Sequence, residues 1–233
     1  PSELAAWYPV AEPHDLIADA IGHLPYTESL FCSLGAAAAR WLLPALAPAS
    51  GALLKCVAVD ADYTLWHGAV GEGGEGRIVV EPRHLELQER LLALRARGVL
   101  IAICSRNDPD AVWAALEAAP TALKRQHVSA ARIHPTLRKS DALRSLADEL
   151  RLSLHSFMLI DDNPAECAEV RAACPEVATW CWPQTHALAR TELRHVWPLD
   201  LTLRPPPTEE DATRVESYEA EARRREDVRA AID

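Results

Sequence analysis

The chain has 233 residues, of which 49% are hydrophobic and 25% are charged, and its formal net charge is -10. This length can bury a sizeable core, as one domain or as one domain with extensions. The negative charge argues against nucleic-acid binding, which needs a basic face, and no apolar run approaches the ~20 residues of a membrane span. No signal peptide is recognisable at the N-terminus, so we expect a cytoplasmic protein.

Six cysteines are spread along the chain without any CxxC pair: Cys32, Cys56, Cys104, Cys167, Cys174 and Cys181. Zinc sites usually place their ligands a few residues apart, and disulfide frameworks are typical of smaller, secreted chains. We therefore expect reduced thiols rather than a zinc cluster or a set of disulfides.

The first 50 residues show helical apolar patterns and no obvious site, so we expect a helical N-terminal extension packed on a core domain at 51–203. In that domain, short apolar runs without two-residue alternation predict buried strands. These runs are 53–59, 99–104, 156–160 and 177–181, with a weaker candidate at 127–133. Between them, leucine spacing and N-cap, Pro and Gly signals predict helices at 84–98, 108–119, 139–152 and 163–174.

This alternation predicts a three-layer α/β fold, in which helices cover both faces of a parallel sheet. Fewer than 20 residues separate Leu65 from His84, and His127 lies 22 positions after Ser105, so we expect little or no cap domain. The segment 204–233 opens with three prolines and then mixes Glu with Arg. That composition predicts a solvated C-terminal helix that leads toward a neighbouring domain.

Polar side chains follow three of the predicted strands, at the edge where parallel α/β sheets collect their chemistry. Asp60, Ser105 and Asp161 each stand at or just after the end of an apolar run. Asp62 lies two residues beyond Asp60, and two such carboxylates can hold a divalent cation while one oxygen attacks phosphorus. Alternatively, one of the two carboxylates caps the following turn. Because three strands point polar groups at one edge, the sequence predicts a site there.

Two further groups fit the same chemistry. Asp162 places a second carboxylate beside Asp161, and Lys139 stands at the start of a predicted helix. Lys139 taken alone is most simply a surface lysine. In this company its ammonium group suits the negative charge that develops during phosphoryl transfer.

The order DxDxT, Ser, Lys, DD resembles the haloacid dehalogenase superfamily of aspartate-nucleophile phosphotransferases. The resemblance implies a HAD-like fold in which Asp60 is the nucleophile and Asp62 is the acid/base. It also implies a Mg²⁺ site made by Asp60, the backbone carbonyl of Asp62, and the pair Asp161 and Asp162. Ser105 and Lys139 would hold the phosphoryl group.

Longer segments are similar to the FkbH-like branch of that superfamily: DADYTLWHGAVGEGGEG, LLALRARGVLIAICSRND, FMLIDDNPAECAEVRAACPEV and LRHVWPLDLTLRPPPTEEDATR. This resemblance implies a glyceryl transferase/phosphatase, part of a larger modular polyketide synthase. Such an enzyme takes a glyceryl unit from 1,3-bisphosphoglycerate, dephosphorylates it and loads it on the phosphopantetheine arm of an acyl carrier protein. Cys104 would hold the acyl group as a thioester. Thr64, Trp66, Arg106 and Asn107 would bind substrate or phosphate.

The chain departs from that branch at several positions. Tyr63 replaces an Asn, His67 and Gly73 also differ, and the segment before Lys139 lacks a Trp and is one residue longer. Arg138 is therefore an alternative to Lys139 as the phosphate-binding cation. These changes leave a related three-carbon acid open as the acyl group. A plain small-molecule phosphatase and a catalytically silent docking domain are the two alternative functions.

Overall fold

The computed structural model describes residues 10–46, 54–71, 78–193, 195–201 and 208–230. The chain divides into two compact units, Pro1–Gly51 with Thr202–Pro205, and Ala52–Leu201 with Pro206–Asp233. The first unit contains helices α2 (Leu16–Gly22) and α3 (Glu28–Leu46), as the sequence predicts, and the side chain of Asp15 caps α2. Whether this extension packs on the core stays a prediction. No helix of the described ranges is long and apolar enough to cross a membrane.

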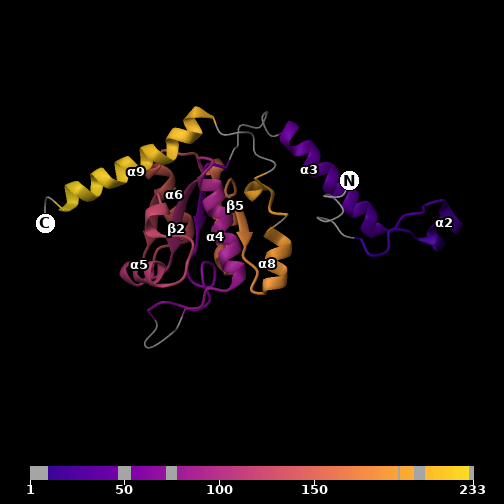
Figure 1. Cartoon of the computed structure of the whole chain (residues 1–233), viewed down its shortest axis with the longest axis horizontal. Helices are drawn as coiled ribbons and strands as arrows, with labels where there is room; N and C mark the ends of the chain where they lie inside the picture. The colour runs from indigo at the N-terminus through magenta and orange to yellow at the C-terminus, as the bar shows by residue number, and fades with distance from the viewer. Residues whose placement is uncertain (1–9, 47–53, 72–77, 194, 202–207, 231–233) are drawn as a thin grey trace. The chain divides into compact units, whose positions relative to one another are not determined.

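The second unit contains the β-sheet and the helices α4 to α9 (Figure 1). The sheet has five parallel strands in the order β3-β2-β1-β4-β5. Its strands are β1 (Cys56–Val59), β2 (Leu100–Ser105), β3 (Ala130–Ile133), β4 (Phe157–Asp161) and β5 (Ala178–Cys181). All five overlap the predicted runs, including the weaker candidate, which is the edge strand β3. The parallel α/β fold predicted from the sequence is confirmed.

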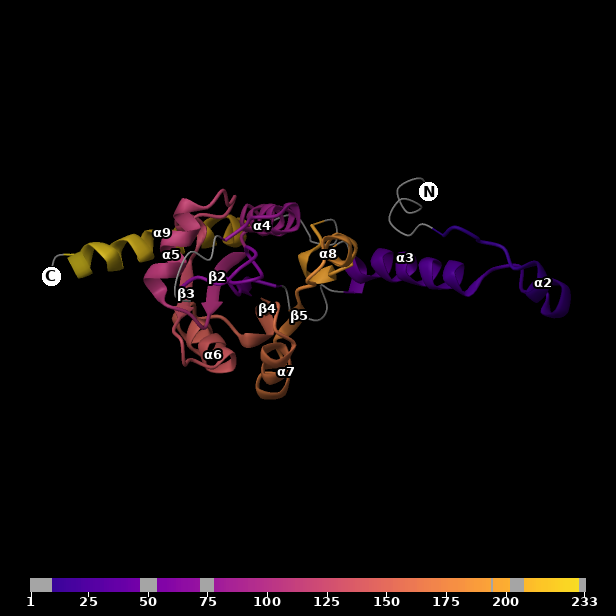
Figure 2. The same ribbon diagram turned by 90° about the horizontal axis from the view of Figure 1, so that it is seen from below.

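Helices cover both faces of this sheet, with α6 and α7 on one side and α4 and α8 on the other (Figure 2). The bounds of the helices in this unit are α4 (Pro82–Arg95), α5 (Pro109–Ala118), α6 (Lys139–Glu149), α7 (Pro164–Ala173), α8 (His186–Leu193) and α9 (Glu209–Ala230). Alternate strand residues supply the two cores, because neighbouring side chains of a strand point to opposite faces. Val59 and Ile103 pack with α4 and α5, whereas Ala58 and Cys104 pack with α6.

The strand register brings the candidate site residues to one edge. Val59 of β1 pairs with Ile160 of β4 and with Ile103 of β2. The next residue of β1, Asp60, donates its backbone N–H to Ile160 at 2.9 Å and so lies beside Asp161. The parallel sheet therefore places these carboxylates together without any special loop.

Both connections in which a cap domain could stand are short. After β1 the described residues run through turns, and an isolated bridge pairs His67 with Val79 before α4 begins. After β2 the chain forms α5 and one 3-10 turn (Arg125–His127) before β3. Within the described parts of both connections there is no inserted domain, which agrees with the sequence prediction.

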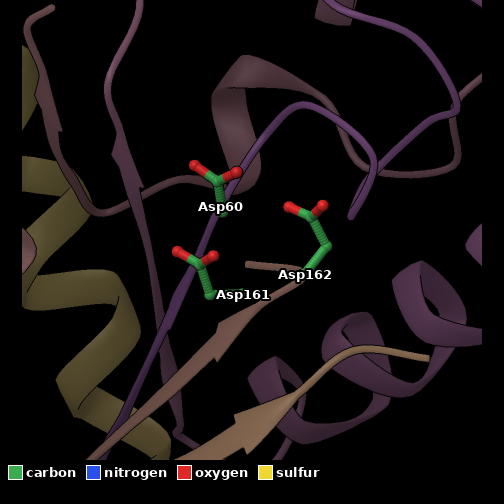
Figure 3. A group of neighbouring side chains, drawn as sticks. All are labelled: Asp60, Asp161 and Asp162. Atoms are coloured by element: carbon green, nitrogen blue, oxygen red, sulfur yellow. The ribbon is translucent and has the colours of Figure 1, made fainter. Parts of the chain in front are cut away.

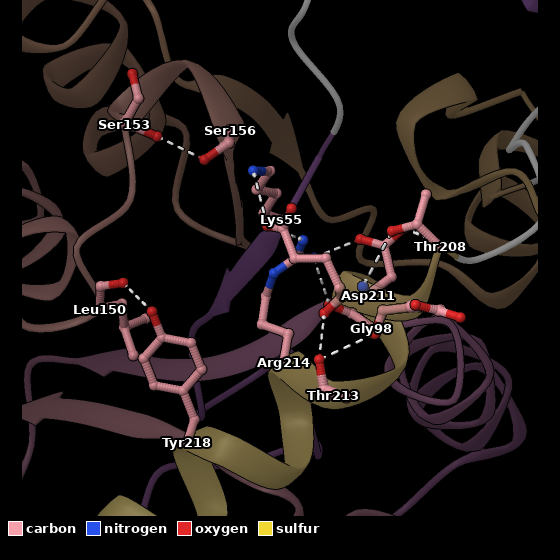
Figure 4. Close-up of polar contacts among 12 residues, drawn as sticks. Lys55, Gly98, Leu150, Ser153, Ser156, Thr208, Asp211, Thr213, Arg214 and Tyr218 are labelled. Atoms are coloured by element: carbon pink, nitrogen blue, oxygen red, sulfur yellow. Dashed lines mark hydrogen bonds and ion pairs between the residues drawn. The ribbon is translucent and has the colours of Figure 1, made fainter.

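The C-terminal helix α9 packs on the sheet domain through its first half (Figure 4). Arg214 and Val215 are buried, Arg214 Nη1 donates to the carbonyl of Gly98 at 3.0 Å, and Tyr218 donates its hydroxyl to the carbonyl of Leu150. Gly98 precedes β2 and Leu150 follows α6, so these contacts lie at the sheet edge opposite Asp60. The prediction of a solvated helix was wrong for this half of α9. The mixed Glu and Arg residues gave no apolar pattern from which the buried face with Arg214 and Val215 could be recognised.

Replacing Gly98 by Ala tests this docking. Gly98 has φ = +84°, and a Cβ there would overlap the backbone carbonyl of Asp211. We expect Gly98→Ala to lower the free energy of unfolding by about 2–4 kcal/mol in urea denaturation, because a strained backbone adds to the overlap. Gly35→Ala is the control, since a Cβ at this helical glycine meets no atom within 4 Å. Equal stabilities of the two variants would contradict this packing.

Candidate active site

Three carboxylates converge at the carboxyl edge of the sheet (Figure 3). Asp60 follows β1, Asp161 ends β4, and Asp162 follows it, and one oxygen of each lies within 4.8 Å of the other two. Asp60 and Asp161 are buried and Asp162 is half-buried. Buried negative charges repel one another strongly, so this arrangement needs a compensating cation.

Lys139 supplies that cation from the first turn of α6. Its Nζ lies 2.6 Å from Asp60 Oδ1 and 2.9 Å from Asp161 Oδ2, and it donates to the carbonyl of Cys104 at 2.5 Å. Burial alone would lower the pKa of Lys139, but the charges of Asp60 and Asp161 raise it above its ordinary value. Burial raises the pKa of Asp60, while Lys139 acts in the opposite direction. The ammonium group is therefore held charged between two carboxylates.

The structure distinguishes Lys139 from Arg138, which the sequence left as alternatives. The Lys139 side chain is 3% exposed, whereas the Arg138 side chain is 73% exposed and lies 3.7 Å from Glu169. The two side chains differ in exposure because Arg138 is the N-cap residue of α6, whereas Lys139 is the first residue of the helix. Lys139 is the one of the two that faces the carboxylates.

The oxygens of Asp161 and Asp162 differ in their surroundings. Asp161 Oδ1 accepts a hydrogen bond from the backbone N–H of Asn163 at 2.9 Å. Asp161 Oδ2 is fully buried and has its ion pair with Lys139, but no well-aligned hydrogen bond from the described residues. Asp162 Oδ2 accepts from Gln184 Nε2 at 3.2 Å. Burial, followed by the charges of Asp60 and Asp161, raises the pKa of Asp162 to about 6.

Asp62 is held by three donors next to this group. Its oxygens accept hydrogen bonds from Trp66 Nε1 at 3.0 Å, the backbone N–H of Val70 at 3.2 Å and Asn107 Nδ2 at 2.6 Å. Its carboxylate is not a member of the three-carboxylate group. Any contribution of Asp62 to a metal site would fall to its backbone carbonyl, as the family resemblance implies.

These residues surround a cavity of about 450 Å³, a size typical of small-molecule sites. Its lining comprises Asp60, Asp62, Tyr63, Ser105, Arg106, Asn107, Lys139, Asp161, Asp162, Asn163, Pro164, Glu166 and Gln184. Ser105 is buried, and a hydrogen bond from its side chain lowers the pKa of Asp60. The structure thus gathers eight of the eleven candidate site residues into one cavity. These eight are Asp60, Asp62, Ser105, Arg106, Asn107, Lys139, Asp161 and Asp162.

Three candidates from the sequence do not line the cavity. Thr64 and Trp66 are completely buried, and Trp66 contacts Asp62 rather than open space, so the cavity lining does not support their expected substrate-binding roles, which stay predictions. Cys104 is 1% exposed and packs against α6, on the opposite side of β2 from Ser105. Burial raises the pKa of its thiol to about 12. Strand alternation explains this placement, because Cys104 and Ser105 are consecutive residues of β2.

Five lining residues were not site candidates in the sequence analysis: Tyr63, Asn163, Pro164, Glu166 and Gln184. Gln184 comes from the loop after β5, and no pattern in that loop indicates its contact with Asp162. Glu166 lies on the first turn of α7 and pairs with Arg106 at 2.8 Å. Its place four residues beyond Asp162 was a usable signal. Tyr63 adopts φ = +55°, a conformation that a tyrosine rarely takes.

Comparisons with known proteins support the fold. The chain is similar to the N-terminal part of the protein BF1531 from Bacteroides fragilis, which contains a phosphatase domain and was solved in complex with Mg. The TM-score is 0.68 at 24% identity, over 86% of this chain and 53% of that one, so the chain spans about half of that structure's length. The Moraxella catarrhalis 3-deoxy-D-manno-octulosonate 8-phosphate phosphatase, solved with magnesium, phosphate and KDO, has 23% identity and covers 52% of this chain and 66% of that one. Its TM-score is 0.38, too low to carry an argument.

No family model matches the chain, and no curated protein matches it either. The comparisons therefore support a fold class for this chain and not a family. The five-stranded parallel sheet with flanking helices is the haloacid dehalogenase-like α/β fold that the sequence predicts.

Metal binding to the three carboxylates can be tested directly. Carboxylate oxygens are the ligands that Mg²⁺ prefers, and Asp161 Oδ2 has unused acceptor capacity. We expect Asp161→Asn to weaken Mg²⁺ binding by about tenfold or more in isothermal titration calorimetry, because it removes one of three anionic ligands. Asp62→Asn is the matched control, since its carboxylate lies outside the group. Loss of binding in Asp62→Asn alone would refute this assignment.

Proposed function

We propose that the protein is a Mg²⁺-dependent phosphatase that acts on small phosphorylated molecules, with Asp60 as the nucleophile. The observation that carries this proposal is the position of Asp60, which is paired with a buried ammonium group and faces a cavity beside two other carboxylates. That arrangement suits transfer of a phosphoryl group to a carboxylate. The fold, and the Mg-bound phosphatase domain of the Bacteroides structure, support it.

The proposed reaction has two steps. In the first step an Asp60 oxygen attacks phosphorus, the bond from phosphorus to the leaving oxygen breaks, and Asp62 gives that oxygen a proton. In the second step a water attacks the aspartyl phosphate, Asp62 takes the proton of the water, and phosphate leaves Asp60. Lys139 and Ser105 hold Asp60 in place through both steps. Trp66 and Asn107 fix the carboxylate of Asp62.

The carboxylates that would hold Mg²⁺ are Asp60, Asp161 and Asp162, with the backbone carbonyl of Asp62 as a further ligand implied by the resemblance. When bound, Mg²⁺ withdraws charge from phosphoryl oxygens and reduces their repulsion of an attacking carboxylate. The three carboxylates fit such a cation, because all their donor atoms are oxygens within 4.8 Å of one another. Lys139 alone neutralises one of their charges, which leaves the group anionic.

Glyceryl transfer is a separate and finer proposal. In it, the Cys104 thiolate attacks the acyl carbon of 1,3-bisphosphoglycerate, a C–S bond forms, and phosphate leaves from that carbon. Asp60 removes the remaining phosphate of this thioester by the two steps above, and the thiol of an acyl carrier protein then takes the glyceryl group and releases the Cys104 thiol. The motifs around Asp60 and Cys104 support this reading. The burial of Cys104 and its raised thiol pKa, about 12, count against it.

Phosphate release and covalent mass together separate the functions. We expect Asp60→Asn to lower Mg²⁺-dependent phosphate release from acetyl phosphate and 3-phosphoglycerate by on the order of 10³-fold, because the nucleophile is lost. We expect the rate of phosphate release by Cys104→Ser to stay within about twofold of the wild-type rate. Asp141→Asn is the control for loss of one carboxylate, since its side chain is exposed on α6.

Other outcomes identify the alternatives. A glyceryl adduct seen by intact mass, and lost in Cys104→Ser, would favour acyl transfer over the plain phosphatase. No Mg²⁺-dependent release from any phosphate ester, with no effect of Asp60→Asn, would contradict the proposed function and favour a silent docking domain.

A further inference from the structure

The charges that line the cavity leave one cation available to a ligand. Five carboxylates and two cations, Lys139 and Arg106, line the cavity. Lys139 has three N–H donors, and its Nζ already has three oxygen neighbours within 2.9 Å, on Asp60, Asp161 and Cys104. Lys139 is therefore committed to the protein's own oxygens.

Arg106 is in a different state. Its side chain is 49% exposed, and two of its five N–H donors are used: Nε donates to the carbonyl of Pro135 at 3.4 Å and Nη1 to Glu166 at 2.8 Å. No other hydrogen bond joins Arg106 to the described residues. The ion pair with Glu166 holds the guanidinium group at the cavity wall while three donors remain for a ligand.

The position of Arg106 along the chain relates it to the reacting group. It directly follows Ser105, whose side chain contacts Asp60, and both line the same cavity. A ligand with its phosphoryl group at Asp60 must place the rest of its structure in that cavity. A planar guanidinium group binds a carboxylate or a phosphate through two parallel hydrogen bonds. An uncharged hydroxyl group forms weaker hydrogen bonds with the same donors than a charged group does.

We propose that Arg106 is a specificity-determining residue that binds a second anionic group of the substrate. The preferred substrates are then small phosphorylated molecules that carry a carboxylate or a second phosphate. Glu166 orients the guanidinium group and competes with the ligand for it. This inference rests on the proposed function, because it places the phosphoryl group at Asp60.

The test compares two probes that differ in one group. 3-Phosphoglycerate has a carboxylate where glycerol 3-phosphate has a hydroxymethyl group. Binding is measured by calorimetry with Ca²⁺ in place of Mg²⁺, so that the result does not depend on turnover. We expect 3-phosphoglycerate to bind about tenfold or more tightly than glycerol 3-phosphate, and Arg106→Gln to abolish that preference.

Two further variants sharpen the result. Arg144→Gln is the matched control, because its side chain is 48% exposed, is ion-paired with Asp141 and lies outside the cavity lining; it should keep the preference. Glu166→Gln removes the competing carboxylate and should increase the preference severalfold. Equal binding of both probes to the wild type, or an equal loss of both in Arg106→Gln, would overturn the inference. Failure of the proposed function would instead appear as absent Mg²⁺-dependent phosphate release.

Discussion

The ammonium group of Lys139 is the interaction on which the site depends. Its three contacts, to Asp60, Asp161 and the carbonyl of Cys104, join the ends of three strands to the start of α6. Removing one partner from such a buried set typically costs 3–5 kcal/mol, because an uncompensated charge is left behind. The carboxyl edge of the sheet can therefore carry several buried carboxylates only because α6 begins with a lysine at this point.

The parallel sheet itself positions most of the residues of the site. Register alone places Asp60 beside Asp161, and strand alternation turns Ser105 toward the cavity while Cys104 packs against α6. The same alternation separates the two chemical readings of the sequence. Phosphoryl transfer uses residues that the sheet edge presents together, whereas acyl transfer requires the one side chain that the sheet turns away.

The elements and most of the site were predictable, because buried parallel strands and helix caps depend on local patterns that survive folding. The residues Asp60, Asp62, Ser105 and Asp161 could be placed since a parallel sheet collects its strand ends. Other features depend on side-chain packing that no local pattern records. The choice of Lys139 over Arg138 depends on which of the two is the first residue of α6. The burial of Trp66 depends on its hydrogen bond to Asp62, and the contact of Gln184 with Asp162 depends on where the loop after β5 lies. The docked half of α9 was missed for the same reason.

The central claim is that Asp60 becomes phosphorylated, and trapping that intermediate tests it most directly. The protein would be mixed with acetyl phosphate and Mg²⁺, quenched in acid during turnover, digested and examined by mass spectrometry. The account predicts one phosphoryl group on the peptide that contains Asp60, absent when Mg²⁺ is omitted. Turnover with the phosphoryl group on another residue, or with no phosphorylated peptide while Asp60→Asn remains active, would contradict it.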